Sequence, residues 1–358
     1  MTGYACLECG APYPDEFTHI CQQCRGTFSL RGPIEYVSEK IDPFAPGIWR
    51  WRDTFGLPDS APAVSLGEGS TPLVSAKLFG RAVRLKMESA NPTGSYKDRL
   101  AAPLVSLLKA HGITEAVEDS SGNAGAAFAA YCARAGIKAR VFVPNSASGP
   151  KRAQFEAYGA EVAAVPGPRP NATAEVIRIA NTGTAYASHA LLPHGLAGIA
   201  TVAYELVEQM DGEVPGTVLT PVGHGGLLLG VIEGFRALQS ARQIEQLPHF
   251  VGIQAENNAP LWAEANNQPF VPRPTAAGGI AVQQPARMRE LLDYVRQGVL
   301  EFVTVSEAEI AEGHLKLAKM GFYIEPTSAV VWGALKKTIG KIGGEVVAII
   351  SGHGLKHS

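Results

Sequence analysis

The chain has 358 residues, of which 46% are hydrophobic, so it is long enough for two domains with a sizeable core. Its formal net charge of -2, spread without a long run of one sign, argues against a dedicated nucleic-acid-binding or membrane-surface protein. The sequence shows neither an apolar stretch as long as a membrane span nor the pattern of a signal peptide. We therefore expect a cytoplasmic protein without a membrane or nucleic-acid partner.

Four of the five cysteines lie in the first 24 residues, where they form two Cys-x-x-Cys pairs. The pairs are Cys6 with Cys9 and Cys21 with Cys24. Two such pairs can place four thiolates around one zinc ion in a tetrahedron, whereas disulfides are disfavoured in a reducing cytoplasm. The spacing predicts a closed, structural zinc ribbon over residues 1–30. Bare thiols and redox-active cysteines remain the alternatives.

Strand-like and helix-like segments alternate from residue 83 onwards. Apolar runs predict strands over 83–87, 139–143, 161–165, 218–222, 250–254, 302–305 and 346–350. Helices are expected after residues 97, 125 and 150, over 172–180 and 196–209, and from a capping box at 306–309 towards 320. This alternation predicts an α/β fold with largely parallel sheets.

The segment 91–99, Asn-Pro-Thr-Gly-Ser-Tyr-Lys-Asp-Arg, connects an expected strand to an expected helix, with Ser95 as the capping residue. Lys97 then falls in the first helical turn, where a cation is unfavourable because the helix N-terminus is already positive. Either the Lys97 side chain reaches solvent, or its amine is held uncharged. An uncharged lysine amine can form a Schiff base with a carbonyl cofactor.

A glycine-rich turn follows the strand expected over 218–222 and opens an apolar helix. It consists of Gly223, His224, Gly225, Gly226 and Leu227. Backbone N–H groups at such a helix start bind anions, and the spacing matches neither a nucleotide P-loop nor a dinucleotide fingerprint. The turn therefore suits a small phosphate monoester. A glycine turn needed only for packing is the alternative.

Two further turns carry polar side chains at strand ends. Ser120 and Ser121, with the free N–H groups of the next helix, can hold a carboxylate, and Asn123 can hydrogen-bond a ring hydroxyl. A simple N-cap is the alternative there. Ser351, after the last expected strand, can hydrogen-bond a pyridine nitrogen without protonating it.

The motifs in chain order resemble those of the threonine synthases, a group within the tryptophan-synthase-β-like family of pyridoxal-phosphate enzymes. The resemblance extends from about Gly67 to Lys356, and the cysteine ribbon also resembles that of some threonine synthases. The motifs are Gly-Glu-Gly-Ser-Thr-Pro-Leu (67–73), the segment 91–99, Ser-Ser-Gly-Asn-Ala-Gly (120–125), Gly-His-Gly-Gly-Leu-Leu-Leu-Gly (223–230), Glu-Pro-Thr-Ser-Ala (325–329) and Ser-Gly-His-Gly-Leu-Lys (351–356).

The resemblance implies fold type II of the pyridoxal-phosphate enzymes, with two parallel-sheet domains besides the ribbon and a homodimeric assembly. The large cofactor-binding domain would comprise 31–100 and 205–358, and the small mobile domain 101–204. Lys97 would carry pyridoxal phosphate and move protons as acid and base. Asn123 would contact the ring oxygen, 223–227 the cofactor phosphate and Ser351 the ring nitrogen, while Ser95, Ser120 and Ser121 would face the amino-acid substrate.

The implied reaction converts O-phosphohomoserine and water to threonine and phosphate. However, the loop 192–201 lacks the Arg and Lys that threonine synthases often carry there, and a phosphorylated substrate needs cationic partners. Lys151 and Arg152 are the leading substitutes, although they equally suit a solvated helix face. His194 is a further candidate, and Arg99 a weaker one because it follows Asp98.

Two other functions remain open at this point. A serine or threonine dehydratase would use the same lysine for a simple β-elimination. A zinc-ribbon binding module with a degenerate catalytic body would be expected to lose the lysine or the glycine turn, and both are present.

Overall fold

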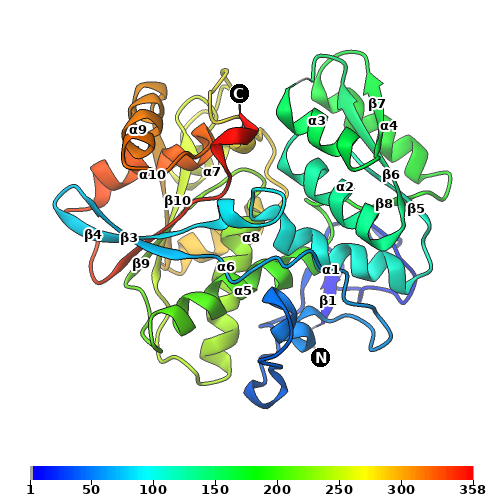
Figure 1. The fold of residues 1–358 in the computed structure, drawn as a ribbon, viewed down its shortest axis with the longest axis horizontal. Helices are drawn as coiled ribbons and strands as arrows, with labels where there is room; N and C mark the ends of the chain where they lie inside the picture. Colours follow the sequence, from blue (N-terminus) through cyan, green and yellow to red (C-terminus); the bar gives the residue numbers. More distant parts are fainter. Residues whose placement is uncertain (1–2, 148, 358) are drawn as a thin grey trace.

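The computed structural model describes residues 3–147 and 149–357, which form two sheets of different size and a short N-terminal ribbon (Figure 1). The ribbon pairs two antiparallel strands, β1 (Tyr4–Cys6) and β2 (Phe28–Leu30). The predicted α/β fold is confirmed, because both sheets are largely parallel and helices cover them. No helix in the described ranges is long and apolar enough to cross a membrane.

The larger sheet has six strands in the order β11-β10-β9-β12-β4-β3, and every neighbouring pair is parallel except β3 with β4. The central strands β9 and β12 are buried at every residue, as expected for a parallel sheet covered on both faces. The strands are β3 (Leu73–Leu78), β4 (Arg81–Lys86), β9 (Thr217–Pro221), β10 (His249–Ala255), β11 (Leu300–Val305) and β12 (Val346–Ile349).

The smaller sheet has four parallel strands in the order β7-β6-β5-β8. All of them come from one continuous part of the chain, whereas the larger sheet takes strands from both sides of it. The domain boundaries at 100 and 204 remain a prediction. The strands are β5 (Glu115–Glu118), β6 (Lys138–Pro144), β7 (Glu161–Val165) and β8 (Ala185–Tyr186).

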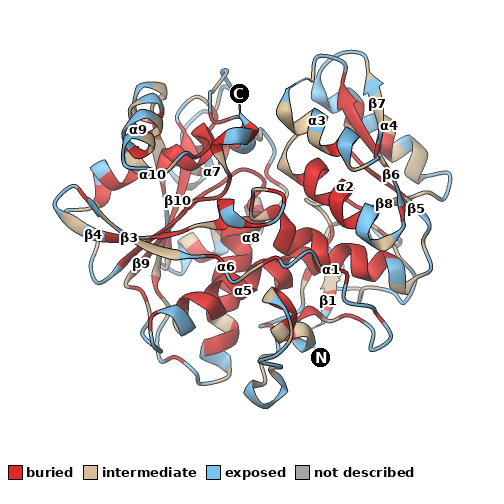
Figure 2. Cartoon of the chain, in the orientation of Figure 1, coloured by how far each residue is buried: buried red, intermediate tan, exposed pale blue. Residues whose placement is uncertain are grey.

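Helix α5 packs against both α1 and α6 in the middle of the molecule. Figure 2 shows these three helices as mostly buried, while α9 shows an exposed outer face. The α-helices are α1 (Lys97–Ala110), α2 (Asn123–Ala135), α3 (Pro150–Ala157), α4 (Arg169–Ala180), α5 (His194–Gln209), α6 (Gly226–Ser240), α7 (Pro260–Ala265), α8 (Met288–Arg296), α9 (Glu307–Lys319) and α10 (Pro326–Thr338). Short 3-10 helices are η1 (Ser38–Lys40), η2 (Gly47–Phe55), η3 (Glu88–Ala90), η4 (Gly278–Ile280) and η5 (Gly354–Lys356).

The helix ends show which local sequence signals predict the start or end of a helix correctly. The capping box of Ser306 and Glu309 is present at the start of α9, and Gly136 ends α2 in the left-handed conformation at φ 68°. The prediction that Ser95 caps α1 is wrong, because the capping position belongs to Tyr96 and has no side-chain cap bond. The Ser95 hydroxyl is instead buried without a hydrogen-bond partner in the described residues.

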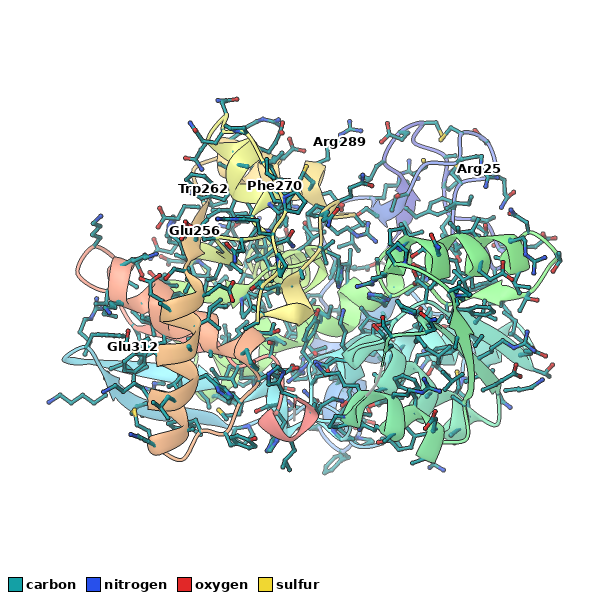
Figure 3. The ribbon with its side chains drawn as sticks, turned by 90° about the horizontal axis from the view of Figure 1, so that it is seen from above. Arg25, Glu256, Trp262, Phe270, Arg289 and Glu312 are labelled. Atoms are coloured by element: carbon teal, nitrogen blue, oxygen red, sulfur yellow. The ribbon has the colours of Figure 1, made fainter. Side chains whose placement is uncertain are left out.

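The ribbon is attached to the body through buried aromatic and polar contacts. The ring of Tyr4 lies 4.3 Å from that of His194 at the start of α5, and Arg287 donates to the Phe28 carbonyl at 2.7 Å. Arg289 on α8 faces the ribbon (Figure 3) and donates to the Leu7 carbonyl at 3.3 Å. His194 is therefore buried beneath the ribbon and does not line the cavity described below.

Candidate active site

A cavity of about 280 Å³ lies between the two sheets, beyond the carboxyl ends of their strands. Its walls include the turn after β5 (Ser120 to Ala124), the turn after β9 (Val222 to Gly225) and Ser351 after β12. Ligands of α/β proteins usually bind at such strand ends. The turns on which the sequence motifs lie are therefore brought to one place.

Lys97 is the first residue of α1 and lines this cavity, with its Nζ atom 2.8 Å from Nε2 of His224. Only 7% of the residue is exposed. Burial lowers the pKa of Lys97 to about 7, and the positive charge of Arg169 contributes, while Glu118 opposes the shift. Of the two sequence-based interpretations, a buried and readily uncharged amine fits the structure, and a solvated lysine does not.

The glycine turn after β9 presents unpaired backbone donors to the cavity. Within the described residues, the N–H groups of Gly223, His224 and Gly225 have no hydrogen-bond acceptor. Gly225 has φ 98°, and a Cβ atom there would lie 2.8 Å from the Arg287 side chain, so glycine is required. Free N–H groups at the start of the 15-residue helix α6 form a site for an anion.

Asn123 and Ser351 add two polar groups to the same cavity. Nδ2 of Asn123 donates to Oε1 of Glu325 at 2.7 Å, and the Oδ1 atom of Asn123 is buried without a partner in the described residues. The hydroxyl of Ser351 lies 3.0 Å from that of Ser328. An unpaired amide oxygen and a hydroxyl complement a ring that carries a hydroxyl group and a nitrogen acceptor.

Ser120 and Ser121 also line the cavity. The Ser120 hydroxyl accepts a hydrogen bond from the Gly122 N–H at 3.2 Å, and Gly122 occupies the capping position of α2 without a side-chain cap bond. The simple N-cap alternative is therefore not observed. Ser95, in contrast, is buried beside Gly352 and is not part of the cavity wall.

The cations expected to hold a substrate phosphate fall into different environments. Lys151, at the start of α3, lines the cavity but pairs with Glu325 at 2.8 Å. Arg152 lies outside the cavity wall and pairs with Glu156 at 2.8 Å. Arg99 is fully buried in a separate ionic network.

Sequence reasoning missed Arg169. This residue begins α4, lines the cavity and has no hydrogen bond or ion pair to any described residue. Its guanidinium is near enough to lower the pKa values of Lys97 and His189. The available signal was its place between two prolines at the helix start that follows β7, since segments at the carboxyl ends of parallel strands bind ligands.

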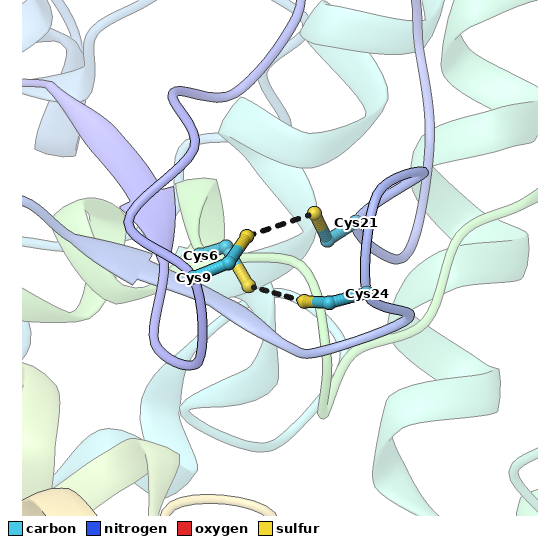
Figure 4. A group of neighbouring side chains, drawn as sticks. All are labelled: Cys6, Cys9, Cys21 and Cys24. Atoms are coloured by element: carbon cyan, nitrogen blue, oxygen red, sulfur yellow. Dashed lines mark hydrogen bonds between the residues drawn. The ribbon is translucent and has the colours of Figure 1, made fainter.

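The four ribbon cysteines converge, as Figure 4 shows. The sulfur atoms of Cys6 and Cys24 are 3.4 Å apart, and those of Cys9 and Cys21 are 3.6 Å apart. All four sulfurs lie within 4.8 Å of one another. A Cβ atom at Gly26 would lie 2.8 Å from the Cys6 sulfur, which explains a glycine beside the cluster. Four thiols in this arrangement fit the donor set of a tetrahedral zinc site.

The cavity thus joins a lysine amine of lowered pKa, an anion-binding turn, an unpaired amide oxygen and a hydroxyl. This set of groups fits a phosphorylated aromatic aldehyde that is attached to the protein through an imine. Consistently, the family model described as pyridoxal-phosphate dependent enzyme matches residues 64–352. The chain belongs to this family.

Within the family, the chain is similar over nearly its whole length to threonine synthases. That of Methanocaldococcus jannaschii is 33% identical over 98% of this chain and 92% of its own length, and that of Methanosarcina acetivorans is 31% identical over 98% and 91%. Among solved structures, a T.th. threonine deaminase superposes with a TM-score of 0.67 at 27% identity, covering 79% of this chain and 92% of that chain. Maize serine racemase, at 21% identity and a TM-score of 0.68 over 79% of this chain and 88% of its own, shares the fold.

Proposed function

We propose that the protein is a threonine synthase, which converts O-phosphohomoserine and water to threonine and phosphate. Similarity to threonine synthases over nearly the full chain supports the reaction type. The observation that supports a phosphorylated substrate is the guanidinium of Arg169, which lines the cavity that contains Lys97, is exposed, and has no ion-pair partner among the described residues. A substrate with a second anionic group gives this guanidinium a partner.

The cofactor and the residues of this chain would have separate roles in the proposed reaction. Pyridoxal phosphate, when bound, supplies the electron sink for the reaction. Lys97 and the turn 223–227 would hold it, and Asn123 and Ser351 would contact its ring. The Lys97 amine then accepts and returns protons at Nζ, which its lowered pKa favours near neutral pH.

The turn at the start of α2 is assigned to the substrate carboxylate. Ser120 and Ser121 present hydroxyls to the cavity, and the first N–H groups of α2 have no intrahelical partner. Arg169 binds the phosphate at the other end of the substrate. Lys151 contributes only if it gives up Glu325, and the position of Arg152 outside the cavity favours a structural role for it.

A serine or threonine dehydratase is the second candidate, because the fold is shared with a threonine deaminase. A dehydratase acts on an uncharged side chain and leaves Arg169 without a partner. The deciding assay follows phosphate and threonine formation from phosphohomoserine, together with keto-acid formation from serine and threonine. Keto acid without threonine would replace the first candidate with the second.

Arg169 provides the sharper test. Replacing it with Gln removes a charged hydrogen bond of about 1.5–3 kcal/mol, so we expect KM for phosphohomoserine to rise by roughly ten- to a hundredfold. The matched control is Arg178→Gln on the same helix, since Arg178 is exposed and pairs with Glu175. Both variants should retain the cofactor. Unchanged KM in Arg169→Gln would reject Arg169 as the phosphate contact.

We also propose that the cysteine cluster binds one structural zinc ion. The four converging sulfurs support this assignment, and the ribbon makes few other buried contacts of its own: its cluster is Cys6, Cys21 and Phe28. So small a core is insufficient for stability without a metal or cross-link.

A further inference from the structure

A second cavity, of about 860 Å³, lies between the ribbon and the smaller sheet. The ribbon contributes residues between Glu16 and Arg25, and the body contributes the turns that lead into β5 and β8. Figure 3 shows Arg25 on the ribbon, on the side of the smaller sheet. None of the described residues lines both this cavity and the one that contains Lys97, so the two are separate places for a ligand.

The wall of this second cavity carries charges of both signs that do not pair with each other. Arg25 and Glu16 are exposed, and neither side chain has an ion-pair partner in the described ranges. Glu115, on the body side, reaches Lys138 and Arg140 only at 3.8 Å. A zwitterion gives the guanidinium and a carboxylate of such a wall one partner each.

Aromatic rings form the deeper part of the cavity. Tyr186 is the most buried residue of the lining, with 3% exposed, and its ring lies 5.0 Å from that of His19 at 57°. The ring of Phe17 lies 6.3 Å from that of His111 nearby in the same wall. Rings below a charged rim fit a ligand that carries an apolar group besides its charges.

Tyr186 also connects the second cavity to the candidate active site. Its hydroxyl donates to Oδ1 of Asp119 at 2.8 Å, and Thr173 donates to Oδ2 of the same carboxylate at 2.5 Å. Asp119 directly precedes the turn of Ser120 and Ser121, and Thr173 lies one helical turn after Arg169 on α4. One carboxylate thus joins Tyr186 to both elements that are assigned to the substrate.

We propose that the second cavity is an effector site for a free α-amino acid, whose binding changes substrate affinity through the Tyr186–Asp119 hydrogen bond. Its carboxylate pairs with Arg25, its ammonium with Glu16, and its side chain packs against the rings of His19 and Tyr186. The coupling is reciprocal, so bound substrate changes the affinity for the effector by the same factor. The coupling rests on the proposed substrate roles of Ser120, Ser121 and Arg169, whereas the effector site itself does not.

The first test measures binding by calorimetry to the full-length holoenzyme after borohydride reduction, which fixes the cofactor on Lys97 and prevents its exchange with an added amino acid. The probes are the twenty common amino acids, with acetate and methylammonium as compounds of a single charge. We expect at least one amino acid to bind, and Arg25→Gln to weaken this binding about tenfold or more through loss of a charged hydrogen bond.

Two variants control for damage to the ribbon. Arg31→Gln changes an exposed arginine of the same ribbon outside the cavity, and should bind like the wild type. Arg25→Lys keeps the charge and should retain most of the affinity. The effector site would be overturned by the absence of amino-acid binding at millimolar concentration, by unchanged binding in Arg25→Gln, or by equally tight binding of acetate or methylammonium. This measurement does not depend on which reaction the enzyme catalyses.

The second test addresses the coupling with unreduced enzyme and the substrate that the phosphate and keto-acid assays identify. The effector should change KM severalfold in the wild type. Tyr186→Phe keeps the ring but removes the bond to Asp119, so it should bind the effector without a change in KM. Tyr158→Phe, which removes a hydroxyl outside both cavities, should respond like the wild type. A KM that ignores the effector in the wild type, or that still responds in Tyr186→Phe, would refute the coupling.

Discussion

At the scale of single residues, the main feature of the site is a lysine that is buried where a cation is unfavourable. Lys97 lies at the positive end of α1, and burial shifts its pKa from 10.5 to about 7. In the unfolded chain the same amine is charged below about pH 10.4. Folding therefore releases a proton from Lys97 between these two pH values, and the protein is less stable for it.

This cost predicts a pH-dependent gain from removing the amine. Without cofactor, Lys97→Met should be more stable than the wild type at pH 7, and the difference should shrink by about 1.4 kcal/mol for each unit of pH increase towards 10. Denaturant unfolding at several pH values measures the free energies. Lys109→Met, on the exposed end of the same helix, should show no such trend. A constant difference across the pH range would mean that Lys97 folds in its charged form.

At the scale of elements, a buried ionic network fixes the helix that carries Lys97. Arg99, two residues further on, makes two hydrogen bonds with each of two carboxylates, Glu88 at 2.7 and 2.8 Å and Glu205 at 2.8 and 2.7 Å. Glu205 also binds Lys86 at 2.6 Å. The network therefore connects α1 to η3, α5 and β4, and it explains Arg99 as a structural residue instead of a substrate contact.

Removal of Arg99 should be costly because it leaves buried carboxylates without their main partner. We expect Arg99→Met to lower the free energy of unfolding by roughly 3–5 kcal/mol, and to weaken cofactor retention through the misplaced Lys97. Arg152→Met is the comparison, because its pair with Glu156 is partly exposed and contributes about 0–1 kcal/mol. Equal effects of the two substitutions in denaturant unfolding would contradict this role for Arg99.

The same network is lost in acid. The positive charges of Arg99 and Lys86 overcome the effect of burial and lower the pKa of Glu205 to about 2. Because this value is below that of the unfolded chain, the contribution to stability is complete above about pH 4.3 and disappears as the pH falls towards 2.

Local sequence signals identified most elements but few of the contacts between them. Apolar runs located strands such as β7 and β10, and glycine or capping residues located the ends of α2 and α9. The loop 67–73 belongs to one of the sequence motifs, and the structure shows Thr71 bound to Glu88 within the ionic network. That partner is fixed by sheet topology, which no local pattern encodes.

In the candidate site, too, local motifs predicted some residues and missed the contacts between distant ones. Lys97, Asn123, Ser351 and the glycine turn were identified because each lies in a motif at a strand end. The pairing of Glu118 with His189 joins positions 71 residues apart, and neither belongs to a motif. Arg169 was missed for the same reason, and Ser95 failed as a cap because the helix begins one residue later than its cap would require.

At the scale of the whole molecule, the ribbon is a separate small unit held against the body. Its contacts with α5 and α8 are made by Tyr4, Phe28 and Leu7. None of the described ribbon residues lines the cavity that contains Lys97. Loss of metal should consequently affect stability more than catalysis.

The zinc prediction follows from this separation. Purified protein should contain about one zinc per chain, and Cys6→Ser with Cys9→Ser should lose it. Chelation should lower the melting temperature while turnover, measured well below that temperature, decreases far less. Cys132→Ser is the control, since this buried thiol in α2 lies outside the cluster. Metal-free protein with unchanged melting would exclude the structural role.

Glu325 has a consequence for the size of substrate that the enzyme can accept. Its two carboxylate oxygens, at the start of α10 beside the larger sheet, bind Asn123 on α2 and Lys151 on α3 beside the smaller sheet. One side chain thus ties both halves of the molecule together across the cavity. A ligand that separated α2 and α3 from α10 would have to break both bonds. We therefore expect the cavity to bind short ligands more tightly than bulky ones, which binding measurements on a series of ligands of increasing length would check.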